Sequence, residues 1–123
     1  QYTVAVERGN EKISKLYTKY HPAVIKLVKS AIDGAHKAGI FCGMCGEAAS
    51  DKLLIPLLIG LGLDEFSMNS NKILQSRKTI SKLNKKECEE LASQILEMAS
   101  ATEVEEKLKE FIEKMFKNSK NVI

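Results

Sequence analysis

The sequence has no tryptophan, only two prolines and no long apolar run, and its charges nearly cancel. Three tyrosines and four phenylalanines offer few rings for stacking on bases, and a net charge of +3 provides no basic footprint, so we expect no nucleic-acid partner. The longest apolar stretch, 53–63, is about half of the ~20 residues that span a bilayer, and no basic-then-apolar leader opens the chain. The sequence therefore predicts neither membrane insertion nor export.

Cysteine is also scarce, and its three copies form no even-numbered disulfide framework. This favours a reducing compartment, and we expect a cytoplasmic protein. The length of 123 residues with 44% hydrophobic content suits one core rather than two. Gln1 stands where Met would begin a complete chain, and an apolar run follows at once, so we expect a piece of a longer chain.

Three short apolar or β-branched runs predict strands, at 2–6, 40–45 and 65–68. Each is followed by a polar or Gly-containing turn and then by helical periodicity, which is typical of βα units and a parallel sheet. An open sheet of three strands leaves two edges unpaired, an arrangement that proteins usually avoid. Either the sheet is shielded or its missing strands belong to residues outside this chain.

Helices are predicted between and after these runs. Pro22 and Gly39 mark the start and end of the first helix, and the aliphatic segment 51–60 predicts a second, largely covered helix. Two amphipathic stretches near the end predict a helical hairpin. Its helix starts are marked by two pairs with the spacing of a cap and an acid, Asn84 with Glu87 and Thr102 with Glu105.

The segment 41–51 is richest in candidate chemistry. Cys45 ends the second predicted strand, and α/β folds place their active sites at the carboxyl ends of parallel strands. Gly43 and Gly46 would let a ligand approach the backbone, and the carboxylate of Glu47 follows closely. The alternative is that Cys45 is only a small buried hydrophobic residue.

Cys42 and Cys45 also form a Cys-x-x-Cys pair, so zinc binding and dithiol redox chemistry need consideration. Zinc requires four ligands, and neither a second pair nor a nearby His is present, so no metal site is predicted. A redox cysteine normally stands at a helix N-terminus, whereas both of these lie in or just after a strand. Positions three apart in a strand point to opposite faces.

Charged residues follow the first predicted strand in the run Arg8-Gly9-Asn10. The planar fork of Arg8 suits a phosphate or a carboxylate, although a single arginine at the surface is more often a solvated salt-bridge partner. His21 and His36 have no visible catalytic companion, and we assign neither a role.

Several of these segments together resemble the C-terminal end of the phosphoenolpyruvate-protein phosphotransferases, enzyme I of the bacterial sugar phosphotransferase system. The related pyruvate phosphate dikinases and phosphoenolpyruvate synthases share the Cys-Gly-Glu block and are the alternative family. The run Gly-Leu-Asp-Glu-Phe-Ser-Met at 62–68, however, resembles enzyme I more closely. The resemblance extends over essentially the whole chain, and its motifs are, in order, residues 1–3, 8–10, 21–24, 43–47 and 62–68.

This resemblance implies an α/β fold, the last three βα units of a phosphoenolpyruvate-binding (β/α)8 TIM barrel, in residues 1–82, with a C-terminal hairpin in 83–123 packed on the same domain. It also implies that Cys45 donates and accepts the proton at the methylene carbon, and that Arg8 binds the substrate phosphate. Glu47 would orient the thiol or a pocket water. A thiol of ordinary pKa, ~8.5, is mostly protonated at neutral pH, as a proton donor requires.

The resemblance also implies what this chain lacks. The Mg2+ ligands, the phosphorylated histidine domain and the domain that docks the phosphocarrier protein would lie upstream, so we expect no turnover by the chain alone. Family members dimerise through this domain, and the unpaired strand edges likewise predict a homodimer. Two other functions stay open at this point: a dithiol oxidoreductase that uses Cys42 and Cys45, and an interaction module whose tail helices bind a partner.

Overall fold

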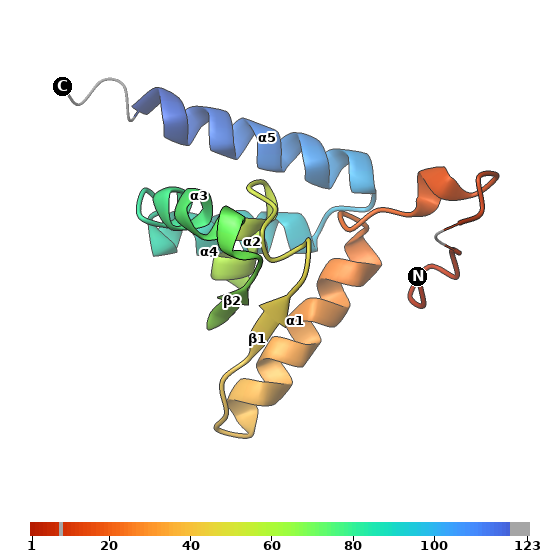
Figure 1. The fold of residues 1–123 in the computed structure, drawn as a ribbon, viewed down its shortest axis with the longest axis horizontal. Coiled ribbons are helices and arrows are strands. Elements are labelled where there is room, and N and C mark those ends of the chain that lie inside the picture. Colours follow the sequence, from red (N-terminus) through yellow and green to blue (C-terminus); the bar gives the residue numbers. More distant parts are fainter. Residues whose placement is uncertain (8, 119–123) are drawn as a thin grey trace.

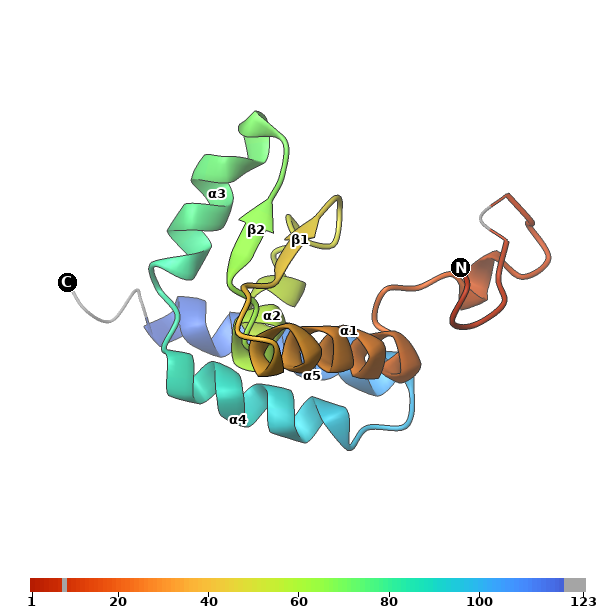
Figure 2. The ribbon, with the colours of Figure 1, turned by 90° about the horizontal axis from the view of Figure 1, so that it is seen from below.

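The computed structural model describes residues 1–7 and 9–118, and it shows an α/β protein in which helices dominate (Figure 1). Two short strands project from a body of packed helices, and the N-terminal segment lies to one side of that body (Figures 1 and 2). In chain order the elements are the 3-10 helix η1 (Ser14–Leu16), α1 (Pro22–Lys37), β1 (Gly43–Cys45), α2 (Leu54–Leu61), β2 (Glu65–Ser67), α3 (Ser70–Ile80), α4 (Lys85–Leu96) and α5 (Ala101–Asn118).

The two strands pair in parallel, as the alternation of strand and helix signals predicts. Met44 of β1 lies opposite Phe66 of β2, and Cys45 lies opposite Ser67. Met44 and Phe66 are half-buried and pack against the hydrophobic core, whereas their neighbours along each strand are exposed. The strands are shorter than predicted, so the exposed residues Ile40 and Phe41 precede β1 instead of belonging to it.

The prediction of a strand over 2–6 is wrong. This segment forms turns, in which the Ala5 amide donates to the Tyr2 carbonyl at 3.3 Å and the Val6 amide donates to the Gln1 carbonyl at 3.1 Å. Ala5 also has a positive φ of 51°, which no strand accommodates. A strand needs a neighbour for its backbone groups, and this segment lies apart from β1 and β2 (Figure 1). Two of the three predicted strands are therefore present in the described part of the chain.

Helix α1 begins and ends where the sequence predicts. His21 is its N-cap and accepts a hydrogen bond from the Ala23 amide through Nδ1 at 3.1 Å, and Pro22 occupies the first helical position. The helix is followed by Gly39, whose φ of +73° favours glycine. Ile32 is buried on the inner face of α1. The histidine thus caps a helix, and the structure gives it no catalytic companion among the described residues.

The core is centred on α2, whose aliphatic side chains are covered on nearly every side. Pro56 falls within the first turn of α2, where its missing N–H has no helical acceptor to lose, so the helix is not broken there. The neighbouring helix α4 crosses α2 at Gly60. A Cβ atom on Gly60 would lie 2.0 Å from the carbonyl oxygen of Cys88 and 2.9 Å from the Cβ of Ala92, so this close approach requires glycine.

The described part of the C-terminal region contains three helices, and the first of them, α3, is the helix expected after the third predicted strand. Asn84 caps α4 as expected, because its side-chain oxygen accepts hydrogen bonds from the backbone amides of residues 86 and 87. The expected cap at Thr102 is wrong, since α5 starts earlier: the Ser100 hydroxyl accepts from the Glu103 amide at 3.3 Å, and the Glu103 carboxylate accepts from the Ala99 and Ser100 amides. This reciprocal pairing is a capping box two residues before the predicted one.

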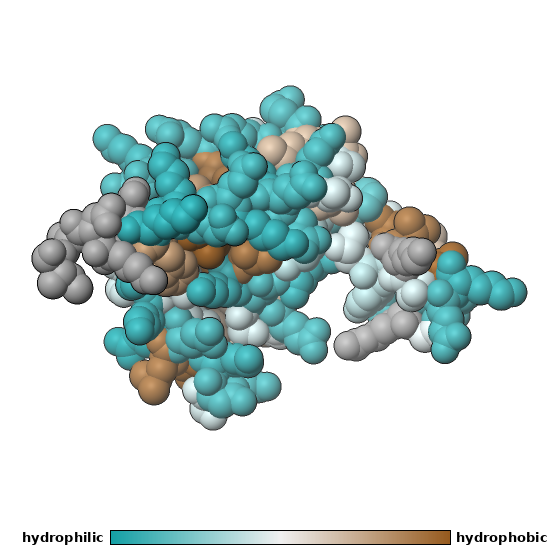
Figure 3. Space-filling model, turned by 90° about the horizontal axis from the view of Figure 1, so that it is seen from above, coloured by the Kyte–Doolittle hydropathy of each residue, from teal (hydrophilic) through white to brown (hydrophobic). Residues whose placement is uncertain are grey.

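The side of the molecule occupied by α5 is mostly hydrophilic, with smaller hydrophobic areas beside it (Figure 3). Within residues 1–7 and 9–118, we find no helix with the length and apolarity needed to cross a membrane. Among the described residues, the large hydrophobic side chains that are more than half exposed are few: Tyr2, Leu16, Leu27, Ile40, Phe41 and Leu74.

Candidate functional site

Cys45 is the last residue of β1, and its side chain is exposed at the carboxyl end of the parallel pair. Cys42 precedes the strand, is half-buried and packs against the hydrophobic core together with Met44. The alternation of side chains along an extended segment therefore puts Cys42 and Cys45 on opposite faces. This arrangement disfavours the dithiol function that their spacing left open.

The third cysteine, Cys88, is fully buried in α4 beside α2. Burial, together with the negative charges of Glu87 and Glu89, raises the pKa of the Cys88 thiol to about 11. A thiol in that state is a packing group with no access to a reactant. Cys45 is thus the most accessible of the three thiols.

Beside Cys45 lies a hollow of about 710 Å³ that is large enough for a small molecule. Glu47 and Ala48 line it from the turn after β1, and Val24 lines it from α1. The segment that leads into α1 contributes residues 17–20. The remaining lining residues are Gln1 and Val4 of the N-terminal turn. A strand end, a turn and the approach to a helix therefore converge on one concave surface.

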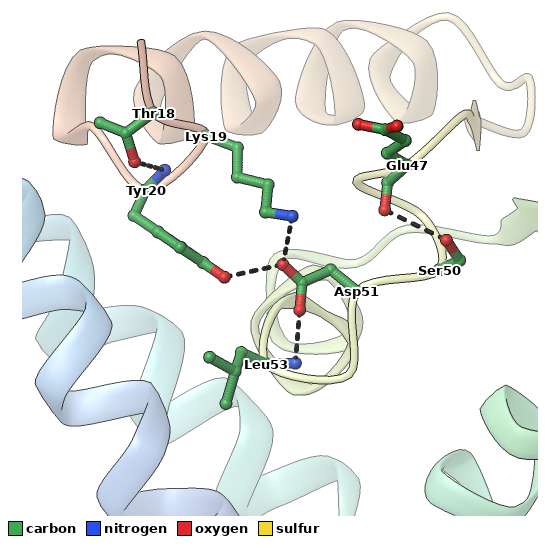
Figure 4. A network of polar contacts seen from close by, with 7 residues as sticks. All are labelled: Thr18, Lys19, Tyr20, Glu47, Ser50, Asp51 and Leu53. Carbon is green, nitrogen blue, oxygen red and sulfur yellow. Dashed lines mark hydrogen bonds and ion pairs between the residues drawn. The ribbon is translucent and has the colours of Figure 1, made fainter. Parts of the chain in front are cut away.

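A group of polar contacts around Asp51, called the junction below, lies at the end of the turn between β1 and α2 (Figure 4). The Tyr20 hydroxyl donates to Asp51 Oδ2 at 2.7 Å, and the Lys19 ammonium pairs with the same oxygen at 2.6 Å. The other carboxylate oxygen accepts the Leu53 amide at 2.9 Å. The junction ties the approach to α1 to the start of α2, although Lys19 and Tyr20 are far from Asp51 in the sequence.

The charge state of this junction follows from its surroundings. Burial alone would raise the pKa of Asp51, but the hydrogen bonds from Lys19, Tyr20 and the Leu53 amide outweigh it, so the pKa of the carboxyl lies below its ordinary value. Burial and then the bond to Asp51 raise the pKa of Tyr20 above its ordinary value. Asp51 is therefore an anion and Tyr20 a neutral donor at physiological pH.

The turn between β1 and α2 is held by further hydrogen bonds. Gly46 leaves the strand with a φ of +90°, a left-handed conformation that glycine adopts without strain. The Ser50 hydroxyl donates to the Glu47 carbonyl at 3.2 Å, and Ala49 is completely buried. The Asp51 carbonyl accepts the first amides of α2 at 3.0 Å. Figure 4 shows the Glu47 carboxylate on the side of the turn that faces α1.

Of the predicted site residues, Cys45 and Glu47 come together at the hollow, whereas Arg8 lies outside the described residues. His36 forms a separate contact near the other end of β1: its Nε2 lies 2.7 Å from Asp64 Oδ2, which also accepts the Cys42 amide at 2.8 Å. The hydrogen bonds from Cys42 and His36 hold the pKa of Asp64 below its ordinary value. This contact fastens α1 to the sheet away from the hollow.

The described residues include no group of three or more His, Cys, Asp or Glu side chains placed to hold a metal ion. Mg2+ takes oxygen ligands, but Asp51 is already engaged by Lys19 and Tyr20, and Glu47 has no carboxylate partner in the hollow. The part of the chain that the structure describes therefore does not fit a magnesium site of its own.

Lys19, Tyr20 and Asp51 were not predicted as site residues. Neither motif spacing nor periodicity reports a contact between residues 31 positions apart, as Tyr20 and Asp51 are. A weak signal was available in the sequence: an acid directly before an aliphatic helix often caps that helix.

Comparison with known proteins decides the family. The profile described as "PEP-utilising enzyme, PEP-binding domain" matches residues 1–85, more than half of the chain. The chain belongs to this family of PEP-utilising enzymes. This match confirms the resemblance inferred from the motifs. The matched residues include β1, β2 and the residues that line the hollow.

Curated relatives agree with this assignment to the PEP-utilising enzymes. The phosphoenolpyruvate-protein phosphotransferase of Bacillus subtilis is 51% identical over 104 residues, which cover 85% of this chain and 18% of that protein. The protein of the same name from Listeria monocytogenes is 48% identical over 111 residues, 90% of this chain and 19% of that protein. The protein of that name from Staphylococcus aureus is 46% identical over 112 residues, which cover 91% of this chain and 20% of that protein. The chain spans about a fifth of the length of these relatives.

Proposed function

We propose that this chain is the end of the PEP-binding domain of a phosphoenolpyruvate-protein phosphotransferase, with residues 1–82 in the barrel portion and 83–123 forming the helices packed on it. The observation that supports this most is the exposed thiol of Cys45, at the carboxyl end of a parallel strand and beside a hollow, within the segment that matches the PEP-binding profile. Relatives carrying that enzyme name are 46% to 51% identical to the chain.

In the proposed reaction, the phosphoryl group of phosphoenolpyruvate passes to a histidine outside this chain and then to a phosphocarrier protein for sugar uptake. Breaking the bond between phosphorus and the enol oxygen leaves its electron pair on that oxygen, as pyruvate enolate. The enolate then forms a C–H bond at its methylene carbon with the proton of the Cys45 thiol, which yields pyruvate and a thiolate. Solvent returns a proton to the sulfur, and Glu47 orients the thiol or a pocket water.

The proposal extends to groups that the chain does not hold. Mg2+ would be bound by carboxylates of the complete enzyme outside this chain, since the described residues do not fit it. Phosphoenolpyruvate and pyruvate would be the small-molecule partners, and the site of action would be the cytoplasm. These 123 residues alone would form no pyruvate, because the acceptor histidine is proposed to lie outside them.

The direct test of this function uses the complete enzyme, obtained by extending the reading frame upstream. We expect the enzyme to convert phosphoenolpyruvate to pyruvate in proportion to the phosphoryl groups received by a phosphocarrier protein. Phosphocarrier-independent conversion that consumes ATP, AMP or inorganic phosphate would instead identify a pyruvate phosphate dikinase or a phosphoenolpyruvate synthase. No turnover of phosphoenolpyruvate under either condition would contradict the proposal.

Arg8 is proposed to bind the substrate phosphate through its guanidinium. Replacing Arg8 by Lys in the complete enzyme is expected to raise the KM for phosphoenolpyruvate about tenfold or more, because a point charge cannot reproduce two parallel hydrogen bonds to a phosphate. Steady-state kinetics at fixed phosphocarrier concentration measure the effect, and Lys12→Met serves as a control for loss of a nearby charge. An unchanged KM in the Arg8 variant would show that this residue is only a surface cation.

A homodimer is proposed for the isolated chain. Each strand of the described sheet has one neighbour and one unpaired edge, and the residues just before β1, Ile40 and Phe41, are 62% and 70% exposed. Covering a few hundred Å² of such surface contributes several kcal/mol at roughly 25 cal/mol per Å², before the entropy of association is subtracted. Light scattering at micromolar concentration is expected to give twice the monomer mass. A monomer with protected strand amides would show that the edges need no cover.

A further inference from the structure

Two segments that line the hollow, residues 17–20 and the turn after β1, are far apart in the sequence, and a single carboxylate joins them. Asp51 Oδ2 accepts hydrogen bonds from the Tyr20 hydroxyl and the Lys19 ammonium, while Oδ1 accepts the Leu53 amide (Figure 4). The Asp51 side chain is 12% exposed, so its bonds are screened by little water. Both oxygens of the carboxylate therefore accept hydrogen bonds from the protein rather than from water.

The junction determines where the turn after β1 ends. At the other end of this turn, Cys45 is fixed by the pairing of β1 with β2, opposite Ser67. Between Cys45 and Asp51 the chain is not helical, and it leaves the strand through the left-handed Gly46. The direction in which the thiol and the neighbouring Glu47 face the hollow therefore depends on both ends of the turn being held.

Asp51 itself is absent from the residues that line the hollow, whereas Lys19, Tyr20, Cys45 and Glu47 all line it. A residue in this position cannot act by touching a ligand there. It can act by fixing the lining residues relative to one another, because it joins Lys19 and Tyr20 to the end of the turn that contains Glu47.

We propose that Asp51, through its bonds to Lys19 and Tyr20, is a positioning residue that holds the Cys45 thiol and the Glu47 carboxylate in the geometry needed for proton transfer at carbon. The inference rests on the proposed function of Cys45 as proton donor. Proton transfer to carbon requires close alignment, and a displacement of about 1 Å can cost about a hundredfold in rate. Small shifts of the turn would therefore lower turnover without removing any group that contacts the substrate.

The test follows the exchange of pyruvate methyl protons with D2O, catalysed by the complete enzyme and observed by proton NMR. In this exchange the thiolate form of Cys45 takes a methyl proton as the enolate forms, the S–H exchanges its proton with D2O, and the S–D group returns a deuteron to the carbon. The readout is independent of the phosphorylated histidine. Cys45→Ser is measured first, and its near-complete loss of exchange establishes the role on which the inference rests.

Asp51→Asn is then expected to lower the kcat of exchange about tenfold to a hundredfold while the KM for pyruvate changes by less than about threefold. Tyr20→Phe and Lys19→Met each remove one of the two donors on Oδ2, so each is expected to have a smaller effect. Their combined loss should differ from the sum of the single losses, because the two donors share one acceptor. Lys19→Arg retains a donor and should recover most of the rate.

The matched control is Lys29→Met, which breaks the Lys29–Asp33 ion pair on α1, away from the hollow. This variant should exchange protons at the rate of the unsubstituted enzyme. Tyr20→Phe keeps the test informative if Asp51→Asn fails to fold, because it deletes a single hydroxyl. Unchanged kcat in folded Tyr20→Phe and Lys19→Met, with Cys45→Ser inactive, would overturn the positioning role alone. Full exchange by Cys45→Ser would overturn the proposed function instead.

Discussion

Replacement of Cys45 by Ser in the complete enzyme is expected to lower the formation of pyruvate from phosphoenolpyruvate about 10²- to 10⁴-fold, the range that a positioned acid contributes. An alcohol is a much weaker acid than a thiol, so the serine hydroxyl donates its proton to the enolate carbon far more slowly. The side chain is exposed at the end of β1, and the substitution therefore leaves the core and the fold intact. Steady-state assay of pyruvate gives the effect, and thermal unfolding shows that the variant is folded.

Cys42 provides the matched control for this substitution. It has the same side chain three residues earlier, but it is half-buried against the core rather than exposed at the strand end. Cys42→Ala is expected to retain most of the activity. Near-normal pyruvate formation by Cys45→Ser would refute the proton-donor role, and equal losses at both cysteines would revive the dithiol function.

Replacement of Gly60 by Ala is expected to destabilise the fold by about 3 kcal/mol or more, at the upper end of overpacking effects. The added methyl carbon would lie 2.0 Å from the Cys88 carbonyl oxygen and 2.5 Å from its carbonyl carbon, which are backbone atoms of α4. Neither can rotate away, so α2 and α4 must separate and lose the packing that joins them. Urea denaturation followed by circular dichroism measures the change in the free energy of unfolding.

Gly34 in α1 is the control for this second substitution, because a Cβ there meets nothing within 4 Å. Gly34→Ala should stabilise the protein by about 0.5–1 kcal/mol, since alanine favours a helix more than glycine does. If Gly60→Ala were as stable as the unsubstituted protein, the close crossing of α2 and α4 would be wrong.

The elements that the sequence predicted correctly are those with strong local signals. Helix α1 has an apolar stripe between Pro22 and Gly39, and α4 starts at the Asn84 cap. Both signals act within one or two turns of chain, so the surroundings do not need to be known. The parallel pairing of β1 and β2 also followed, because a helix between two strands returns the chain in the same direction.

The errors arose where distant neighbours decide the structure. The run 2–6 has the composition of a strand but no strand beside it, and it forms turns instead. Helix α3 was expected after the third predicted strand, but it is rich in exposed polar residues and has little apolar periodicity, so the sequence pattern did not predict its bounds. At the start of α5, Ser100 with Glu103 and Thr102 with Glu105 have the same spacing, and only the first pair forms the capping box.

The candidate site likewise contains residues that a local motif predicts and residues that only a contact between distant segments brings together. Cys45 and Glu47 belong to one short motif and were found together, and the roles assigned to them stay predictions. The junction of Asp51 with Lys19 and Tyr20 requires the approach to α1 to meet the start of α2, and no pattern within either segment reports that contact. Arg8 lies outside the described residues, so its place relative to the hollow stays a prediction as well.

The measurement that tests the central claim most directly is a crystal structure of the complete enzyme with phosphoenolpyruvate bound. The account predicts that the ligand lies beside the end of β1, with its methylene carbon about 3–3.5 Å from the Cys45 sulfur, the separation of reacting atoms in a productive complex. A ligand bound away from the hollow, or one whose methylene carbon faces a different proton donor, would contradict the assignment of Cys45 and the function built on it.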